Sequence, residues 1–340
     1  MSEYASLRRS TQVGRSVIAA AQLSILALTS WANLTPEVLG HKPAPACISV
    51  VKASLFCVDT SDDKVISRFI AAGILILVII GFLPAVTAVL HAWVAFSLST
   101  SIGLPDGGDS AAAVVTIIII FITARDTRLF AWGRSDPIWS SSVTDGIAWG
   151  AWWILRLQMA FIYIESGLSK FGTAEWMNGS AMHYVVRDPS FGASGPAGLL
   201  ARGITNTAVG TAAVTWGTIV LEVAVGVLIL AGPRARRWAL SLVIALHLGI
   251  IIVIGLWSFA GIMMGAVIIA ATPRQHLLIA PDTGAAFGPE VSEKGVESSI
   301  GSPTSENHEP NLGANQSPTA TQIPHKDQRS MIICVASKSQ

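Results

Sequence analysis

Residues 207–231 read TAVGTAAVTWGTIVLEVAVGVLILA, a stretch in which Glu222 is the only charged side chain. The hydrocarbon core of a bilayer is about 30 Å thick, and a helix needs about 20 largely apolar residues to cross it. This stretch is long enough and apolar enough to do so. It therefore predicts a membrane-spanning helix, and it sets the scale on which the rest of the chain is interpreted.

Other runs of similar character follow one another along the chain. The chain is 51% hydrophobic and 13% charged, with a mean hydropathy of +0.57, which argues against a soluble enzyme. The last apolar run is too long for one crossing, so a turn near residues 255–258 would divide it in two. The remaining runs are residues 13–34, 66–83, 85–102, 111–124, 147–169 and 238–271. We therefore expect an all-α, polytopic membrane bundle of about eight spans.

Arginine clusters predict the orientation of this bundle, because short cytoplasmic loops carry an excess of Lys and Arg. With eight spans, three clusters fall on one side of the membrane. This side would be the cytoplasm, with both termini, and the protein would be a multi-pass protein of the plasma membrane. The clusters are Arg8, Arg9 and Arg15; Arg125, Arg128 and Arg134; and Arg234, Arg236 and Arg237.

The charge distribution separates an apolar body from a polar tail. Residues 281–340 hold seven acidic and four basic side chains, which leaves a net charge of +4 on residues 1–280. We expect a cytoplasmic N-terminus (1–12), a transmembrane domain (13–275) and a disordered cytoplasmic tail (276–340). The run at 13–34 also has features of a secretory signal, so either a retained anchor or a cleaved signal is open. No basic block indicates nucleic-acid binding.

Two cysteines lie in the first loop that this orientation places outside the cell. Cys47 and Cys57 would meet an oxidising environment there, which favours a disulfide that stabilises the loop. The alternative is a redox-active pair that acts on secreted substrates. The spacing is not that of a CxxC motif.

Polar side chains in the run at 147–169 repeat with the period of a helix. Arg156, Tyr163 and Lys170 are seven residues apart, so they share one stripe, and Gln158 and Glu165 form a neighbouring stripe. Such stripes should face other helices or a wet cavity rather than lipid. Lys170 could act as a general base if it is desolvated, or it could extend to the membrane interface. Glu165 could pair with Arg156 or Lys170, or it could be held neutral, so its role stays open.

Other ionisable residues at membrane depth are also candidates for function. Glu222, His247 and His91 could each transfer protons or make structural hydrogen bonds between helices. In the second outward loop, Asp106 and Asp109 suit a turn that caps the next helix, with Asp109 or Ser110 as the N-cap. These two carboxylates could also bind a cation, but further ligands are missing, so we predict no metal site.

The segment at 158–184, QMAFIYIESGLSKFGTAEWMNGSAMHY, resembles the signature of HTTM proteins, the membrane domain shared with vitamin K-dependent gamma-carboxylases. The matching residues are Tyr163, Gly167, Lys170, Trp176 and Gly179. Glu222, His247 and the cluster at 233–237 are also similar to this family. The first half of the chain resembles the SdpB branch, in ISVVKASLFC (48–57), GFLP (81–84), HAW (91–93), DGGD (106–109) and RDTR (125–128).

This resemblance implies a membrane protein that matures an exported antimicrobial peptide with a small soluble SdpA-like partner. It also implies a base at Lys170, with His247 and Glu222 as further catalytic groups and Trp176 nearby. A quinone is a possible cofactor by the same resemblance. The chain has Ser169 where the carboxylases have a second lysine. Whether it is an enzyme, a non-enzymatic export or immunity protein, or a quinone-linked thiol oxidoreductase stays open at this stage.

Overall fold

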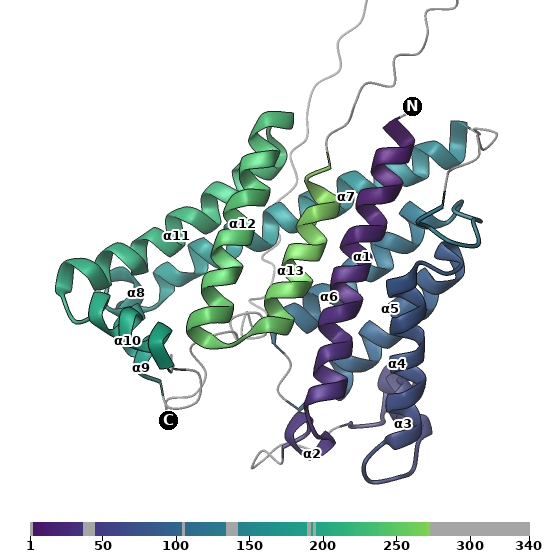
Figure 1. Cartoon of the computed structure of the whole chain (residues 1–340), viewed down its shortest axis with the longest axis horizontal. Coiled ribbons are helices and arrows are strands. Elements are labelled where there is room, and N and C mark those ends of the chain that lie inside the picture. The colour runs from purple at the N-terminus through teal and green to yellow at the C-terminus, as the bar shows by residue number, and fades with distance from the viewer. Residues whose placement is uncertain are drawn as a thin grey trace, which may run out of the picture. The chain divides into compact units, whose positions relative to one another are not determined.

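The computed structural model describes residues 3–36, 45–103, 106–133, 142–188, 192 and 195–272. Over these ranges the chain is helical and contains no β-strand (Figure 1). An isolated bridge between Phe82 and Phe130 joins two turns. The predicted disordered tail, residues 276–340, lies outside the described residues. The all-α class is confirmed for the described part of the chain.

Eight helices occupy the positions of the eight predicted apolar runs. Four of them contain stretches long and apolar enough to cross a membrane: Arg8–Leu28, Val143–Gly172, Ala208–Leu230 and Pro233–Ile254. The other four are shorter or less apolar. The eight helices are α1 (Glu3–Leu28), α4 (Val65–Ile80), α5 (Pro84–Ser101), α6 (Gly107–Thr123), α7 (Ser142–Ser169), α11 (Ala208–Leu230), α12 (Pro233–Ile254) and α13 (Trp257–Ala270).

Short helices fill the connections. They are α2 (Trp31–Leu34), η1 (Ser49–Ala53), α3 (Leu55–Val58), η2 (Lys170–Gly172), α8 (Ala174–Met177), α9 (Ala181–Arg187) and α10 (Gly195–Ile204). The short helices α8, α9 and α10 gather beyond the ends of α7 and α11 (Figure 1). Of these, α8 packs against η2, the short helix that begins at Lys170.

Local chemistry sets the limits of several helices. Pro84 occupies the first turn of α5, where its missing N–H costs nothing. Gly255 ends α12 with a φ of 78°, and α13 begins at Trp257, so the predicted turn near 255–258 is confirmed. The first predicted run differs: α1 begins at Glu3 and ends at Leu28. A second helix starts after Ser30, whose side chain accepts a hydrogen bond from the backbone of Asn33.

The residue predicted as the N-cap of α6 was wrong. Asp106, not Asp109 or Ser110, is the N-cap, and its side chain accepts a hydrogen bond from the backbone N–H of Asp109. The Asp109 side chain in turn accepts one from the backbone of Asp106. The two carboxylates therefore form a reciprocal capping box, and α6 starts at Gly107, before the predicted residue 111.

Helix α13 lies between α1, α12, α6 and α7, and most of its side chains are buried. Its closest approach is to α1, where a Cβ on Gly265 would lie 2.7 Å from the carbonyl oxygen of Gly14. Gly261 and Gly265 form a GxxxG pattern, which lets membrane helices approach closely. This pattern was visible in the sequence, and our sequence analysis missed it.

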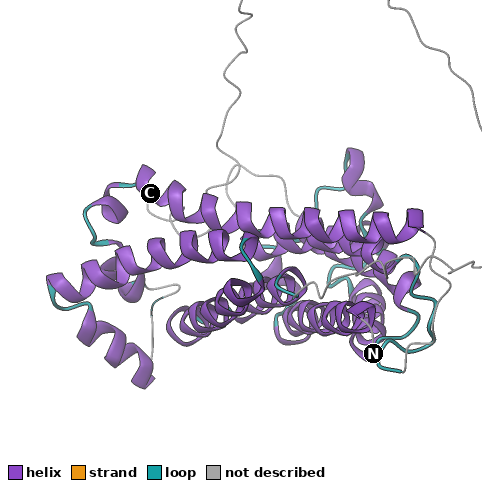
Figure 2. Ribbon diagram, turned by 90° about the horizontal axis from the view of Figure 1, so that it is seen from above, coloured by secondary structure: helices purple, strands orange, loops and turns teal. Residues whose placement is uncertain are grey.

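Helices α7 and α11 pack along each other and run side by side across the bundle (Figure 2). In Figure 1, α7 passes obliquely behind α13 and α1. The start of α1 and the start of α12 lie at one end of this view, and the α12–α13 turn lies at the other. This arrangement brings the middle and end of α7 against three different helices.

Candidate functional site

The stripe predicted on α7 faces the bundle, and each of its three members contacts a different helix. Lys170 pairs with Glu222 of α11, Tyr163 bonds His247 of α12, and Arg156 bonds the end of α13. The seven-residue spacing therefore correctly predicted a shared interior face. The partners come from segments 52 to 116 residues away in sequence.

Lys170 and Glu222 form a partly buried ion pair. The Lys170 Nζ lies 2.6 Å from Glu222 Oε2, and their side chains are 15% and 11% exposed. The ammonium also donates to the carbonyl oxygen and to the Oγ of Ser166, at 2.9 and 3.0 Å. The Ser166 hydroxyl donates to the same carboxylate oxygen at 3.2 Å. We call Ser166, Lys170 and Glu222 the Lys–Glu cluster.

The loop after α7 places an aromatic ring against this cluster. The Lys170 Nζ lies 5.2 Å from the centre of the Trp176 ring, within the range of a cation–π contact. Trp176 is buried, and its carbonyl oxygen accepts a hydrogen bond from the indole of Trp216 on α11. Gly179 follows with a φ of 81°, next to Ala212 of α11. The Trp and Gly of the predicted signature therefore fasten the loop to α11.

Tyr163, seven residues before Lys170 on the same stripe, forms a buried hydrogen-bonded pair with His247. The Tyr163 hydroxyl and His247 Nε2 are 2.8 Å apart, and the ring of Phe259 lies 5.4 Å from the imidazole. The His247 Nδ1 is buried without a hydrogen-bond partner. Whichever nitrogen carries the proton, this ring leaves one polar atom unsatisfied in the interior.

Arg156 holds the C-terminus of α13, a role that the cavity assignment from sequence did not foresee. The guanidinium is fully buried and donates to the carbonyl oxygens of Ala270 and Thr272, at 3.0 and 3.2 Å. It also stacks over the rings of Trp152 and Trp153, at 3.5 and 4.8 Å. The last carbonyls of a helix lack partners within the helix and carry partial negative charge, so a cation there is stabilising.

The second predicted stripe, formed by Gln158 and Glu165, does not face the bundle interior as the first stripe does. Glu165 is exposed, and within the described residues it makes no ion pair, so neither of its possible pairings, with Arg156 or with Lys170, is present. The reason is geometric, because the other side of α7 is the one that meets α11. Gln158 is half-buried. Neither residue joins the Lys–Glu cluster.

His91 belongs to a separate part of the bundle. Its Nε2 lies 2.9 Å from the Oε1 of Gln22 on α1, and the imidazole is fully buried. This contact matches the structural reading of His91, and Gln22 was not anticipated. Asp106 and Asp109 also lie apart, at the start of α6, where burial raises the pKa of the Asp106 carboxyl. Within the described residues, no group of three His, Cys, Asp or Glu side chains could hold a metal ion.

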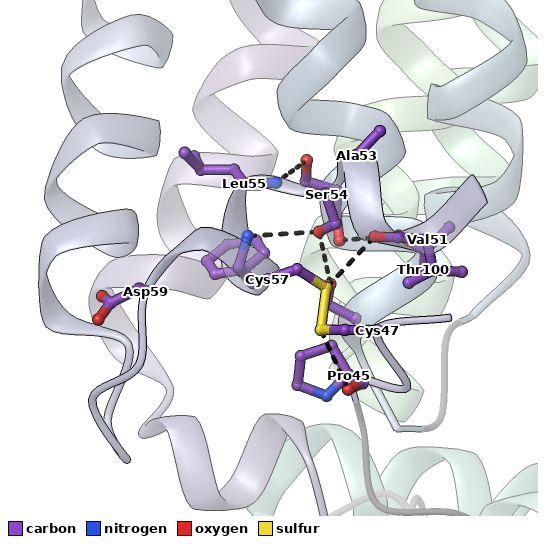
Figure 3. Close-up of a disulfide and its surroundings, with 12 residues drawn as sticks. Pro45, Cys47, Val51, Ala53, Ser54, Leu55, Cys57, Asp59 and Thr100 are labelled. Carbon is purple, nitrogen blue, oxygen red and sulfur yellow. Dashed lines mark hydrogen bonds between the residues drawn. A yellow bond between two sulfur atoms is a disulfide. The ribbon is translucent and has the colours of Figure 1, made fainter. Parts of the chain in front are cut away.

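Cys47 and Cys57 are joined by a disulfide, as predicted (Figure 3). The bridge closes the segment that contains η1 and the start of α3. This segment is also bonded to α5, because the Leu55 N–H donates to Ser97 Oγ and the Trp93 indole donates to the Ala53 carbonyl oxygen. Both contacts favour the structural reading of the bridge.

The hydrogen bonds of Lys170 in this structure do not fit a base that deprotonates a quinone. A base needs a free lone pair, but three protein acceptors surround the Lys170 amine, so it is arranged as a donor. Neither the hollow beside Arg15 nor the one beside His183 includes Lys170 in its wall. We therefore derive no step through a quinone. The cluster can instead hold a proton between two groups 2.6 Å apart.

Ser166, the third member of the cluster, was not among the residues predicted from the sequence. The signal was present, because Ser166 precedes Lys170 by four residues and so lies on the same helical face. No such signal in the sequence indicated that Glu222 pairs with Lys170. It depends on which face of α11 meets α7.

Comparisons with known proteins place the chain among membrane proteins. Residues 113–272 match the model of the HTTM domain. The chain is 32% identical to the uncharacterized protein YitO of Bacillus subtilis over 265 residues, which cover 77% of this chain and 84% of that protein. It is 30% identical to the sporulation-delaying protein SdpB of the same organism over 232 residues, 68% of this chain and 72% of SdpB. No solved structure gives a significant match.

Proposed function

The chain belongs to the SdpB-like family of HTTM-domain membrane proteins, and from this membership we propose a role in a sporulation-delaying-peptide-like system. In this proposal the chain acts in the maturation of an exported antimicrobial peptide, together with a small soluble SdpA-like partner. It spans the plasma membrane through residues 13–275, and both termini, including the tail at 276–340, are cytoplasmic. Lys170 then lies near the outer face.

The observation that carries a catalytic role is the Lys–Glu cluster. A partly buried ion pair is costly to desolvate, and hydrophobic residues of similar volume often stabilise a protein as well or better. A pair at membrane depth is therefore a functional candidate. Its position at the end of α7, beside a buried tryptophan, leaves it 11–15% exposed, whereas Arg156 on the same stripe is fully buried.

In the proposed chemistry, the cluster transfers a proton. The Lys170 ammonium gives one proton to Glu222 Oε2, which leaves a neutral amine and a neutral carboxylic acid. The amine then turns away from Glu222 and accepts a proton from the bound substrate, while Ser166 and Trp176 contact it in the resting pair. Tyr163 and His247 lie deeper along the same stripe and would position the helices rather than contact the peptide.

The test compares strains that carry the wild-type chain, no chain, or variants. The variants are Lys170→Ala, Glu222→Gln and the control Glu165→Gln, which changes the same residue type on an exposed site. Supernatants are analysed by mass spectrometry for peptides that depend on the chain, and the membrane level of each variant is measured. We expect the first two variants to abolish the mature peptide and the control to preserve it.

Loss of one partner could also destabilise the protein, because it leaves a buried charge without compensation, at a cost of about 3–5 kcal/mol. The double variant Lys170→Met/Glu222→Gln removes both charges. If the cluster is catalytic, the double variant regains a normal membrane level and still makes no mature peptide. A double variant that makes mature peptide would refute the catalytic role.

The same experiment separates the competing functions. A peptide whose covalent structure depends on the chain supports an enzyme. A peptide that is chemically unchanged but retained in cells supports export by a non-enzymatic membrane protein. A thiol oxidoreductase would require Cys47 and Cys57 to cycle, so alkylation of free thiols in intact cells should then trap a reduced fraction.

A further inference from the structure

One face of α1 is polar although it is buried in the bundle. Arg8, Thr11, Gln12 and Arg15 follow the spacing of a single helical face, and all four are buried. They line a partly open hollow of about 20 Å³, whose wall also includes Thr123 at the end of α6 and Asp126 in the turn that follows. A hollow of this size holds a water-sized particle, since one water needs about 10–15 Å³.

Arg15 is the anomaly in this hollow. The guanidinium is fully buried, its Nη2 donates to Thr87 Oγ1 at 3.2 Å, and its Nη1 lies 3.5 Å from Gln12 Oε1. Both acceptors are neutral. The Nε has no hydrogen-bond partner, and within the described residues Arg15 forms no ion pair. A buried cation without a compensating charge is unfavourable.

Asp126 is the carboxylate in the wall of this hollow, and its charge acts on Arg15 without forming an ion pair with it. Both oxygens of Asp126 bind Arg128, at 2.7 and 2.6 Å. Arg156 provides a contrast, because that equally buried guanidinium has two helix-terminal carbonyls and two tryptophan rings. Arg15 has no equivalent set of partners.

A second donor lines the same hollow without a partner. The hydroxyl of Thr11, which is 2% exposed, makes no hydrogen bond. A buried hydroxyl and a buried N–H left open at one cavity require a ligand that accepts hydrogen bonds. Since the Arg15 charge also needs compensation, an anion suits the hollow better than water does.

We propose that this hollow binds a small anion between Arg15 and Thr11, with Arg8 as a further guanidinium in its wall. The size allows a chloride ion or a single anionic oxygen of a lipid phosphate. The bound anion would hold the start of α1 against the last turn of α6 and the first turns of α7. This inference is independent of the peptide-maturation role.

The test measures thermal unfolding of the full-length chain in neutral detergent micelles, with chloride replacing gluconate at constant ionic strength. At a chloride concentration ten times the Kd, the ratio of folded to unfolded protein should rise about 11-fold. Thr11→Val should reduce this gain without lowering stability in gluconate, because it removes an unsatisfied hydroxyl. Arg15→Gln should abolish the gain.

The matched control is Arg68→Gln, because Arg68 donates to the carbonyl oxygens of Leu26 and Thr29 and so has its own acceptors. This variant should keep the full chloride response. Equal unfolding midpoints in the two salts for the wild type would exclude chloride as the occupant, and equal midpoints together with no stabilisation by phosphatidylglycerol in the second arm below would overturn the proposal. So would a response that Thr11→Val and Arg15→Gln leave intact.

A second arm identifies the source of the anion. The chain is placed in nanodiscs of phosphatidylcholine or of phosphatidylglycerol, in gluconate throughout. A stabilisation by phosphatidylglycerol that Arg15→Gln removes supports the same site and assigns the anion to a lipid headgroup. A stabilisation that Arg15→Gln does not affect counts against a headgroup in this hollow.

Discussion

Replacement of Arg156 by leucine tests whether the most deeply buried polar residue of α7 is structural. The change removes two hydrogen bonds from a charged donor, each worth about 1.5–3 kcal/mol. It also removes the stacking on Trp152 and Trp153, worth about 0.5–2 kcal/mol. Because leucine fills part of the space, we expect a net loss of about 4 kcal/mol in the free energy of unfolding.

The assay is thermal unfolding of the purified chain in detergent, together with its level in the membrane. A loss of about 4 kcal/mol corresponds to a fall in Tm of about 10 °C for a body of this size. Arg156→Lys keeps the charge but cannot reach both carbonyls with a planar fork, so it should fall between wild type and leucine. Arg234→Gln, an exposed arginine at the start of α12, should leave Tm unchanged.

The opposite pattern would refute this reasoning. If Arg156→Leu leaves Tm and membrane level unchanged but stops peptide maturation, the guanidinium binds substrate in a wet cavity, which is one of the two surroundings that the sequence left open for this stripe. The helix-terminal role would then be incidental. A fall in Tm with proportionate loss of activity is the expected result.

Three further predictions concern packing, the disulfide and one loop carboxylate. Gly265→Val should disrupt the contact between α13 and α1 and lower the folded yield in detergent, whereas Gly249→Val, whose Cβ meets no atom within 4 Å, should not. Cys57→Ser should lower stability under oxidising conditions by about 3 kcal/mol, measured by chemical denaturation, since the bridge closes a short loop. A hydrogen bond from the Ser61 hydroxyl lowers the pKa of Asp59 to about 2, so its stabilising effect is present above about pH 4 and is lost as pH falls through 2. Carboxyl NMR titration should show this value, and Ser61→Ala should raise it.

The positions of the helices could be predicted because the signal is local. A run of about 20 apolar residues must satisfy its backbone internally, whatever it packs against. The turn at Gly255 and the helix start at Pro84 could be predicted because they too depend on local sequence alone. The bond between Cys47 and Cys57 needed only two cysteines in one loop.

The partners of the polar stripe could not be predicted in this way. Glu165 and Glu175 are the acids nearest to Lys170 in sequence, each five residues away, yet the partner is Glu222. The choice depends on the face at which α7 and α11 meet. Gly226 sets part of that contact, because a Cβ there would lie 2.9 Å from the carbonyl oxygen of Ala160. Close approach of this kind is a property of the packed pair and not of either helix alone.

The stripe on α7 also shows where chemistry is possible. Exposure rises along it, from 0% at Arg156 and 3% at Tyr163 to 15% for the Lys170 side chain. Arg156 is bound to carbonyls of the α13 terminus and Tyr163 to His247, so both connect α7 to neighbouring helices. A ligand could reach these two groups only if the helices separated. Lys170 needs only a movement of its own side chain away from Glu222, and a bound substrate that presents an acidic proton to the amine would induce it. Reactivity on this helix is therefore expected at the Lys–Glu cluster, and variants deeper in the stripe should change stability before they change the peptide product.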